Sequence, residues 1–293
     1  MCVRLQNIKM IDQQHKKKMY NVNTIVVFGA KGMLGHACCE YFEERGYDVL
    51  GYTRVDYDAC VDGTHKLQEL SANWPPLQTV VINAVGVIPQ RANVNQSADY
   101  IKVNSIFPWT LTQFCQLRNV PCFHVSTDCV YNGTETGLIA EGDPHTEQGI
   151  YGLSKSCGEP PEAMIIRTSI IGEELTSKRS LLEWVRSQNG KTIQGYTNHF
   201  WNGVTTNQLA AFIHECIKRN VSWSGVRHVT SPTVVSKYEL VKMIVEEYGL
   251  NITVEPFATP NTVNKALKAS DDQAIRDICH QVIPHIRTQL KYS

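Results

Sequence analysis

The sequence has no long hydrophobic run and no net charge of either sign. No apolar run in its 293 residues approaches the length of a membrane span, and its N-terminus lacks the apolar core of a secretory signal. Lysine plus arginine and aspartate plus glutamate each number 28, so the overall charge does not favour nucleic acid or an anionic membrane as a partner. These absences predict a globular protein of the cytoplasm.

The ten cysteines lack the spacing of a metal site or of a disulfide framework. They are scattered through apolar segments, without Cys-x-x-Cys or combined Cys and His ligand patterns. In a cytosolic chain most such cysteines are expected to be buried free thiols that act as small hydrophobes. We therefore expect no metal site.

Basic residues are concentrated at the N-terminus. Residues 1–23 contain five lysines or arginines and one acid. We expect residues 1–22 to be a basic, disordered extension, and a basic interaction arm is the alternative. With 42% hydrophobic residues, the rest of the chain can bury a substantial core.

Three glycines at three-residue spacing follow the first apolar run. The pattern predicts a strand over 24–28, a tight turn, a helix over 33–45 and a second strand over 47–52, which together form a βαβ unit. In such a unit the glycines allow a sharp turn, a close approach to a pyrophosphate and close helix packing, and the helix N-terminus attracts the phosphates. The residues expected to hold a dinucleotide here are Gly29, Lys31, Gly32, Met33, Leu34 and Gly35.

The end of the second predicted strand indicates which dinucleotide binds. Thr53 occupies the position where NAD-binding folds place a ribose-binding acid, and Arg54 follows it. We therefore expect NADPH rather than NADH, with Arg54 and Lys31 facing the extra phosphate. In the alternative interpretation, Asp56 supplies the acid two residues late and Arg54 is a surface residue.

Other cofactor contacts are expected along the next segments. Asp62 is suited to bond the adenine edge, unless it caps the helix predicted over 63–70. A third buried strand is predicted over 79–83, and the small residues after it would let the cofactor lie across its end. Those residues are Ala84, Val85 and Gly86. Asn104, in a long helix predicted over 95–116, is expected to bridge backbone groups rather than to catalyse.

A cluster of reactive side chains follows the fourth predicted strand, over 120–126. Thr127 ends this strand, and Tyr151 and Lys155 lie four residues apart on one face of a later helix. Because a cation favours the phenolate, we expect Lys155 to lower the pKa of Tyr151 from about 10 toward neutrality. Tyr151 would then be a proton donor or acceptor, and Thr127 can bond the same substrate oxygen.

Taken together, the motifs resemble the extended short-chain dehydrogenase/reductase superfamily, and within it the 4-dehydrorhamnose reductase-like branch that acts on nucleotide sugars. The matching stretches are the glycine turn, Asn83-Ala84, Ser126-Thr127-Asp128, Tyr151-x-x-x-Lys155 and Ile166-Arg167-Thr168-Ser169. The resemblance implies an α/β protein with a Rossmann-type doubly wound parallel sheet over 23–172. It also implies a smaller C-terminal α/β substrate-binding region over 173–293, interleaved with the Rossmann core.

The resemblance also implies a function. Thr127, Tyr151 and Lys155 would form a catalytic triad in which Tyr151 protonates the C4 oxygen of a nucleotide-linked 4-keto-6-deoxyhexose. The nicotinamide would deliver hydride to C4, and Lys155 would also hold the nicotinamide ribose. This is a step of rhamnose-type deoxysugar biosynthesis. A homodimer is left open, because Pro160-Pro161 must end the helix of Tyr151 early and weaken a face on which related proteins dimerise.

Cys129 departs from the simple deoxyhexose reductases, which usually carry an aromatic residue there. Proteins resembling GDP-fucose synthase and plant-type 3,5-epimerase/4-reductases carry this cysteine as an acid/base that inverts carbons beside the ketone. A thiol with a reference pKa of about 8.5 suits that exchange, and a buried hydrophobe is the alternative. The partner acid remains open between His199 and Lys178. Nucleotide-sugar 4,6-dehydratases carry Thr-Asp-Glu, so their carboxylate base is missing here.

The last third of the chain is expected to bind the sugar nucleotide. The segment 194–206, rich in glycine, asparagine and aromatic residues, is predicted to be a ligand loop. The expected substrate contacts are Asp128, Asn198, His199 and Trp201. An apolar stripe over 209–217 and a capping box at Ser236-x-x-Glu239 predict two helices, and 269–293 is expected to be helical and peripheral.

A second class of function remains possible on the same fold. The chain is also similar to the regulatory subunit of methionine adenosyltransferase, which implies an NADP-binding subunit without turnover. The intact Thr127, Tyr151 and Lys155 favour the enzyme.

Overall fold

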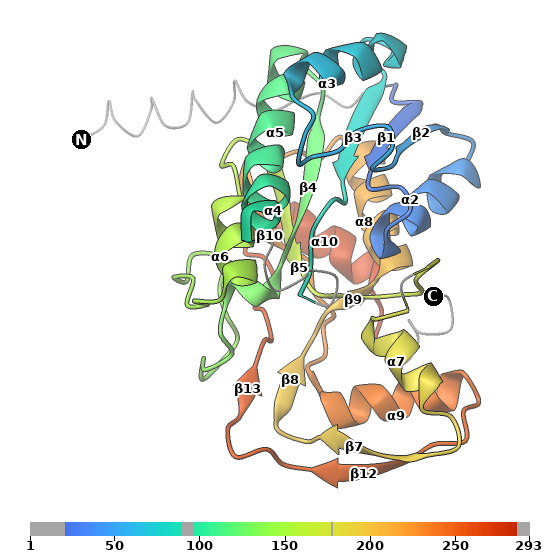
Figure 1. Ribbon diagram of the computed structural model, residues 1–293, viewed down its shortest axis with the longest axis vertical. Coiled ribbons are helices and arrows are strands. Elements are labelled where there is room, and N and C mark those ends of the chain that lie inside the picture. Colours follow the sequence, from blue (N-terminus) through green and yellow to red (C-terminus); the bar gives the residue numbers. More distant parts are fainter. Residues whose placement is uncertain (1–20, 90–96, 177, 286–293) are drawn as a thin grey trace.

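A six-stranded parallel sheet forms the centre of the protein, which we describe from a computed structural model that covers residues 21–89, 97–176 and 178–285 (Figure 1). The strand order is β10-β5-β4-β3-β1-β2, with the reversal of order between β1 and β3. The strands are β1 (Thr24–Phe28), β2 (Asp48–Tyr52), β3 (Thr79–Asn83), β4 (Cys122–Thr127), β5 (Met164–Thr168) and β10 (Gly225–His228). The predicted doubly wound sheet is confirmed.

Helices cover both faces of this sheet because its central strands are apolar on both sides. All five residues of β1, β3 and β5 are buried, which is typical of a parallel sheet between helical layers. Alternate residues of β1 enter different cores: Val27 packs with α2 and α8, and Val26 packs with α3 and α5. These helices are α2 (Met33–Glu43), α8 (Thr206–Lys218), α3 (Thr64–Leu70) and α5 (Phe107–Leu117).

The helix predicted over 95–116 is interrupted by a π-turn. It consists of α4 (Ser97–Ile101), a π-helical stretch over Lys102–Ile106, and α5. Residues 95 and 96 lie outside the described part of the chain. A π-turn adds one residue to a helical turn and is often found at functional sites. This one carries Asn104.

A smaller lobe lies beyond the main sheet, at the bottom of Figure 1. Its core is formed by buried residues such as Leu182, Trp201 and Ile244. Its elements are β6 (Ile170–Ile171), α7 (Leu181–Ser187), β7 (Thr192–Tyr196), β8 (His199–Trp201), β9 (Val204–Thr205), β11 (Val235–Ser236), α9 (Lys237–Glu247), β12 (Thr253–Phe257) and β13 (Val263–Asn264). The chain returns from this lobe to the main sheet through α8 and β10.

The segment 194–206, expected to be a loop, is instead mostly β-structure, so the loop prediction is wrong, whereas its expected role in ligand binding stays a prediction. β7 pairs in parallel with β12, and β8 pairs with β11 and β13. The physical reason is the distant partners: His199 pairs with Val263, which a local pattern does not reveal. In contrast, the capping box at Ser236 and Glu239 is confirmed, with a bond from Glu239 N–H to Ser236 Oγ at 3.1 Å and the return bond at 2.7 Å.

The C-terminal helix, α10 (Gln273–Val282), is not peripheral as expected. Ile275 and Ile278 are fully buried in the same core as α8, because α10 presents one strongly apolar face to it. Residues 286–293 lie outside the described chain, as do residues 1–20 of the extension predicted over 1–22.

The nine cysteines within the described ranges are free thiols. Four are buried, four are partly exposed and Cys157 is exposed, so fewer are buried than expected. Among the helices that the structure describes, none is long and apolar enough to cross a membrane.

Candidate active site

The glycine turn after β1 is built by close backbone contacts. Gly29 has φ +86°, a region that favours glycine, and an added Cβ would lie 3.0 Å from the Ala84 carbonyl. A Cβ on Gly35 would lie only 2.0 Å from the Gly29 oxygen. The turn is closed by a bond from Gly32 N–H to the Gly29 carbonyl at 2.8 Å. The predicted geometry of the turn is therefore present, with α2 beginning at Met33.

The start of α2 fits a dinucleotide phosphate. Its N-cap, Gly32, provides no side-chain cap, and the first turn contains no acid, so its first N–H groups are left to an external anion. Beside this turn, the Asn83 carboxamide accepts a bond from Val85 N–H at 3.1 Å, but its buried Nδ2 has no partner among the residues that the structure describes. A cofactor rich in acceptors would satisfy this donor.

The end of β2 carries the side chains expected at the adenosine ribose. Thr53 donates both its N–H and its hydroxyl to Asp56 at 2.8 Å, and these bonds, together with the charge of Lys31, lower the pKa of Asp56. Arg54 is exposed and pairs with Asp58 at 3.0 Å. Lys31, Arg54 and Asp56 therefore lie close together, and Arg54 is free to turn toward a phosphate at little cost.

Asp62 does not cap α3. The N-cap is Gly63, and the Asp62 carboxylate instead accepts a bond from Asp58 N–H at 2.7 Å. The alternative role as a helix cap is therefore wrong, because the carboxylate is used within the preceding loop.

Asn104 bridges backbone groups, as expected. From the π-turn, it accepts a bond from Val87 N–H at 2.8 Å and donates to the Val87 carbonyl at 2.9 Å and to Ser154 at 3.0 Å. These bonds fix the segment Ala84-Val85-Gly86, which runs past the glycine turn. They also tie it to α6 (Ile150–Cys157), the helix that carries Tyr151 and Lys155.

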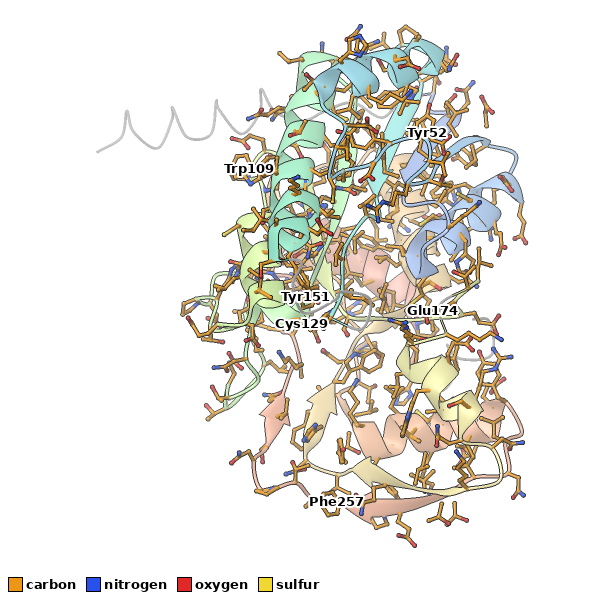
Figure 2. All side chains as sticks on the ribbon, viewed as in Figure 1. Tyr52, Trp109, Cys129, Tyr151, Glu174 and Phe257 are labelled. Atoms are coloured by element: carbon orange, nitrogen blue, oxygen red, sulfur yellow. The ribbon has the colours of Figure 1, made fainter. Side chains whose placement is uncertain are left out.

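Tyr151 and Cys129 lie next to each other (Figure 2), and Thr127, the last residue of β4, also contacts Tyr151. Thr127 pairs with Thr168 of β5, and its hydroxyl accepts a bond from Cys129 N–H at 3.1 Å as the N-cap of a 3₁₀ turn over Asp128–Val130. Ser154 donates to the Tyr151 carbonyl at 2.8 Å. α6 ends at Cys157 before Pro160, as its sequence predicts.

The expected lowering of the Tyr151 pKa is wrong. Burial raises it above the ordinary value, the charges of Cys129 and Asp128 add to this, and hydrogen bonding with Thr127 opposes it. Lys155 does not offset the burial, because its ammonium donates to the Val125 carbonyl at 3.0 Å. Tyr151 is therefore a neutral phenol at physiological pH and can act as a proton donor.

Lys155 is the group that titrates near neutrality. Burial lowers its pKa to about 8, while Glu159 and Cys129 raise it. Its ammonium form predominates at pH 7.

Glu159 is a site residue that the sequence did not single out. Its buried carboxylate accepts bonds from Arg167 at 2.6 and 3.1 Å and from Ser126 at 2.5 Å, which joins the end of α6 to β4 and β5. Arg167 in turn donates to Tyr131 at 2.6 Å and contacts His145 at 2.8 Å. In the sequence, the only local sign of the role of Glu159 is its position just after the helix that carries Tyr151 and Lys155.

Two acidic groups next to Thr127 have pKa values above their ordinary values. Burial raises the pKa of Asp128, against the charges of Lys265 and Lys237. Burial and the Asp128 charge raise the pKa of Cys129 to about 12. The expected thiol near 8.5 is therefore wrong for this state of the site, because the sulfur lies in a desolvated position beside a carboxylate.

The side chains of the smaller lobe that were expected to contact the substrate, Asn198, His199 and Trp201, bond to other residues of the protein. The Asn198 carboxamide is engaged by Thr259, with bonds of 2.8 and 3.1 Å to its carbonyl and N–H, and His199 contacts the Thr259 hydroxyl at 2.8 Å. Trp201 is buried, and its Nε1 donates to Ser169 at 2.7 Å. Lys178 is exposed.

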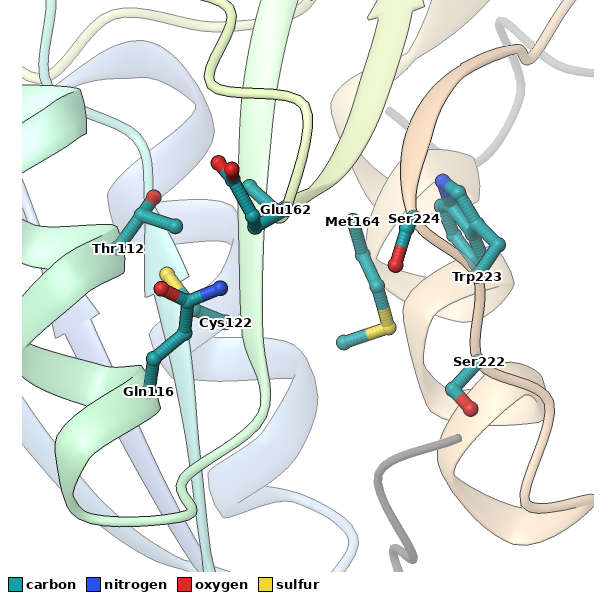
Figure 3. Close-up of a pocket in the computed structure, with 9 residues that line it drawn as sticks. Thr112, Gln116, Cys122, Glu162, Met164, Ser222, Trp223 and Ser224 are labelled. Atoms are coloured by element: carbon teal, nitrogen blue, oxygen red, sulfur yellow. The ribbon is translucent and has the colours of Figure 1, made fainter. Parts of the chain in front are cut away.

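The small pocket in Figure 3 is separate from this site. It is lined by Cys122 and Met164, the first residues of β4 and β5, whereas Thr127 and Thr168 end those strands. Its volume of about 20 Å³ holds little more than one water. Within the ranges that the structure covers, no group of His, Cys, Asp and Glu is arranged to hold a metal ion.

Comparison with known proteins identifies a family and several relatives. The family model for the RmlD substrate binding domain matches residues 23–291. A dTDP-4-dehydrorhamnose reductase from Aggregatibacter actinomycetemcomitans is 27% identical over 261 residues, which cover 83% of this chain and 85% of that protein. A probable low-salt glycan biosynthesis reductase from Haloferax volcanii is 26% identical over 247 residues, covering 78% and 81%.

Solved structures share the fold over nearly the whole chain. The dTDP-4-dehydrorhamnose reductase of Bacillus anthracis, crystallised with NADP, superposes with a TM-score of 0.76 at 18% identity and covers 92% of this chain and 97% of that one. A GDP-mannoheptose C4 reductase from Campylobacter jejuni, with NADP bound, gives 0.70 at 14% identity, covering 92% and 96%.

Proposed function

The chain belongs to the RmlD substrate binding domain family, and on that premise we propose that it is an NADPH-dependent reductase of a nucleotide-linked 4-keto-6-deoxyhexose in the cytoplasm. The observation that carries this proposal is the meeting of Thr127, Tyr151 and Lys155 at the end of β4. The relatives named above are reductases, and two neighbours bind NADP, which supports the reaction type and the cofactor.

The free N–H groups of α2 and the orphaned amide of Asn83 would hold the cofactor. NADPH, when bound, supplies the hydride that reduces a C4 ketone. Lys31 and Arg54, near the end of β2, would contact the phosphate that distinguishes NADPH from NADH.

The proton comes from the chain itself. As the C4 oxygen gains negative charge, the neutral phenol of Tyr151 donates its proton to it, and the Thr127 hydroxyl holds the same oxygen in place. The ammonium of Lys155, which donates to the Val125 carbonyl, would also hold the nicotinamide ribose. The raised pKa of Tyr151 therefore favours reduction of a ketone at neutral pH.

Epimerisation at C3 and C5 is a second activity that the position of Cys129 supports. The Cys129 sulfur lies 3.5 Å from an Asp128 carboxylate oxygen, and Cys129 is close enough to Tyr151 to raise the pKa of its phenol. With a pKa of about 12, the thiol would return a proton to a carbon beside the ketone after the partner group, His199 or Lys178, has removed the proton from its opposite face. The test is the Cys129→Ala variant: if solvent deuterium still enters C3 and C5 at the wild-type rate, Cys129 takes no part.

The reductase assay uses dTDP- and UDP-4-keto-6-deoxyglucose with NADPH, followed by the loss of nicotinamide absorbance. The wild-type protein is expected to oxidise NADPH with one of these sugars, and Tyr151→Phe is expected to be roughly a hundredfold slower or worse. Absence of oxidation with every 4-keto sugar, N-acetylated ones included, would reject the enzyme and favour an NADP-binding regulatory subunit.

A further inference from the structure

Lys237 lies where the smaller lobe meets the catalytic edge, the end of β4 that carries Thr127. β11 pairs antiparallel with β8, with Ser236 opposite Phe200, and Ser236 caps α9. Lys237 is the first residue of that helix. Its Nζ lies 5.1 Å from the centre of the Trp201 ring, a distance typical of a cation–π contact.

The Trp201 ring fixes the ammonium relative to the reacting groups. Trp201 is 3% exposed, its Nε1 donates to Ser169 Oγ at 2.7 Å, and a Cβ on Gly203 would lie 2.4 Å from its ring. Ser169 directly follows Thr168, which pairs with Thr127. A short, rigid series of contacts therefore connects Lys237 to Thr127.

The Lys237 ammonium lies near the residues that follow Thr127 in the chain. It acts on Asp128 and Cys129, the two residues that follow Thr127, and on His199. Within the described ranges, however, no ion pair within 4.0 Å and no hydrogen bond engages its ammonium. Lys237 is partly buried, and burial lowers its pKa, so its ammonium is partly withdrawn from water while its three donors lack an acceptor among the described residues.

We propose that Lys237 is a substrate-contacting residue that donates a hydrogen bond to an oxygen of the hexose, which lies between Lys237 and Asp128. The proposal rests on the proposed function and names a contact of the same site. A hexose hydroxyl can accept from the ammonium and donate to a carboxylate. The Asp128 carboxylate would repel a diphosphate at this point, which favours the sugar over the phosphates.

The test compares Lys237→Met with Lys237→Arg and with Lys242→Met. Lys242 is a matched control, because it is exposed on the same helix and its Nζ lies 5.5 Å from the Tyr238 ring. A lost charged hydrogen bond is expected to raise the KM for the 4-keto sugar roughly tenfold or more. The kcat and the KM for NADPH should change less than about threefold, Lys237→Arg should recover part of the loss, and Lys242→Met should match wild type.

Calorimetric binding of dTDP-glucose and of dTDP separates this proposal from the reductase proposal, because neither ligand turns over. Lys237→Met is expected to weaken dTDP-glucose roughly tenfold and to leave dTDP unchanged. Equal loss for both ligands, or no loss for either, would overturn the contact with the hexose. If wild type reduces no 4-keto sugar, the reductase proposal fails, and the dTDP-glucose comparison still decides the role of Lys237. Lys237→Gln, checked by its urea midpoint, replaces the methionine variant if that one unfolds.

Discussion

Replacing Glu159 with glutamine tests whether a buried ion pair holds the catalytic edge together. The side chains of Glu159 and Arg167 are only 6% and 2% exposed. Glu159→Gln keeps an oxygen that can accept one bond from the guanidinium, but it removes the negative charge. Arg167 would then be a buried cation whose remaining partners are neutral, among them the Tyr131 hydroxyl.

The size of the effect follows from this burial. Breaking a buried ion pair by removing one partner costs about 3–5 kcal/mol, and the remaining amide oxygen places Glu159→Gln near the lower end, at about 3 kcal/mol. Adding Arg167→Met removes the uncompensated cation. The double variant should therefore lose clearly less stability than the sum of the two single variants.

The assay is urea unfolding at pH 7, with stability read from the midpoint at constant m-value. Glu162→Gln is the matched control, because Glu162 is exposed nearby and should stay within about 0.5 kcal/mol of wild type. A loss below about 1 kcal/mol for Glu159→Gln, or strictly additive losses in the double variant, would refute the reasoning.

Three further predictions concern pH and the cofactor. The kcat/KM for the 4-keto sugar should fall as pH rises through about 8, because Lys155 then loses its proton; Glu159→Gln should move this limb to lower pH, and an unmoved limb would contradict the assignment. Stability should fall as pH drops from about 6.5 toward 4, because burial lowers the pKa of His228 to about 4 and the unfolded chain binds the proton first; the share of His228 is about 3 kcal/mol, and His228→Gln should reduce the fall in urea titrations by that amount. Arg54→Ala should weaken NADPH roughly tenfold in fluorescence titrations and leave NADH unchanged, and equal losses would reject the phosphate contact.

The sequence predicted those parts of the fold that depend on neighbouring residues. The glycine turn and the Ser236 capping box arise from interactions within a few residues, and the first three strands are marked by local apolar runs; all were found where expected. The doubly wound parallel sheet was implied by the family resemblance.

The errors concern interactions between distant residues. The segment 194–206 was expected to be a loop because its partners, β12 and β13, come about sixty residues later. The pKa of Tyr151 was predicted from its neighbour Lys155 and that of Cys129 from the reference value of a thiol, whereas burial dominates both. Glu159 and Lys237 were missed because their roles depend on contacts with Arg167 and Trp201.

The two halves of the site are built from different parts of the polypeptide. Around the cofactor, main-chain atoms set the shape: a Cβ on Gly35 would meet the Gly29 carbonyl, and one on Gly158, at the end of α6, would lie 1.8 Å from the Asn104 carbonyl. On the side where we propose that the hexose binds, side chains on short strands and a helix start set the shape, Trp201 and Lys237 among them. Point substitutions can therefore retune sugar selectivity while nucleotide binding and proton transfer stay intact, which makes the smaller lobe the part to diversify when the enzyme is re-engineered for other hexoses.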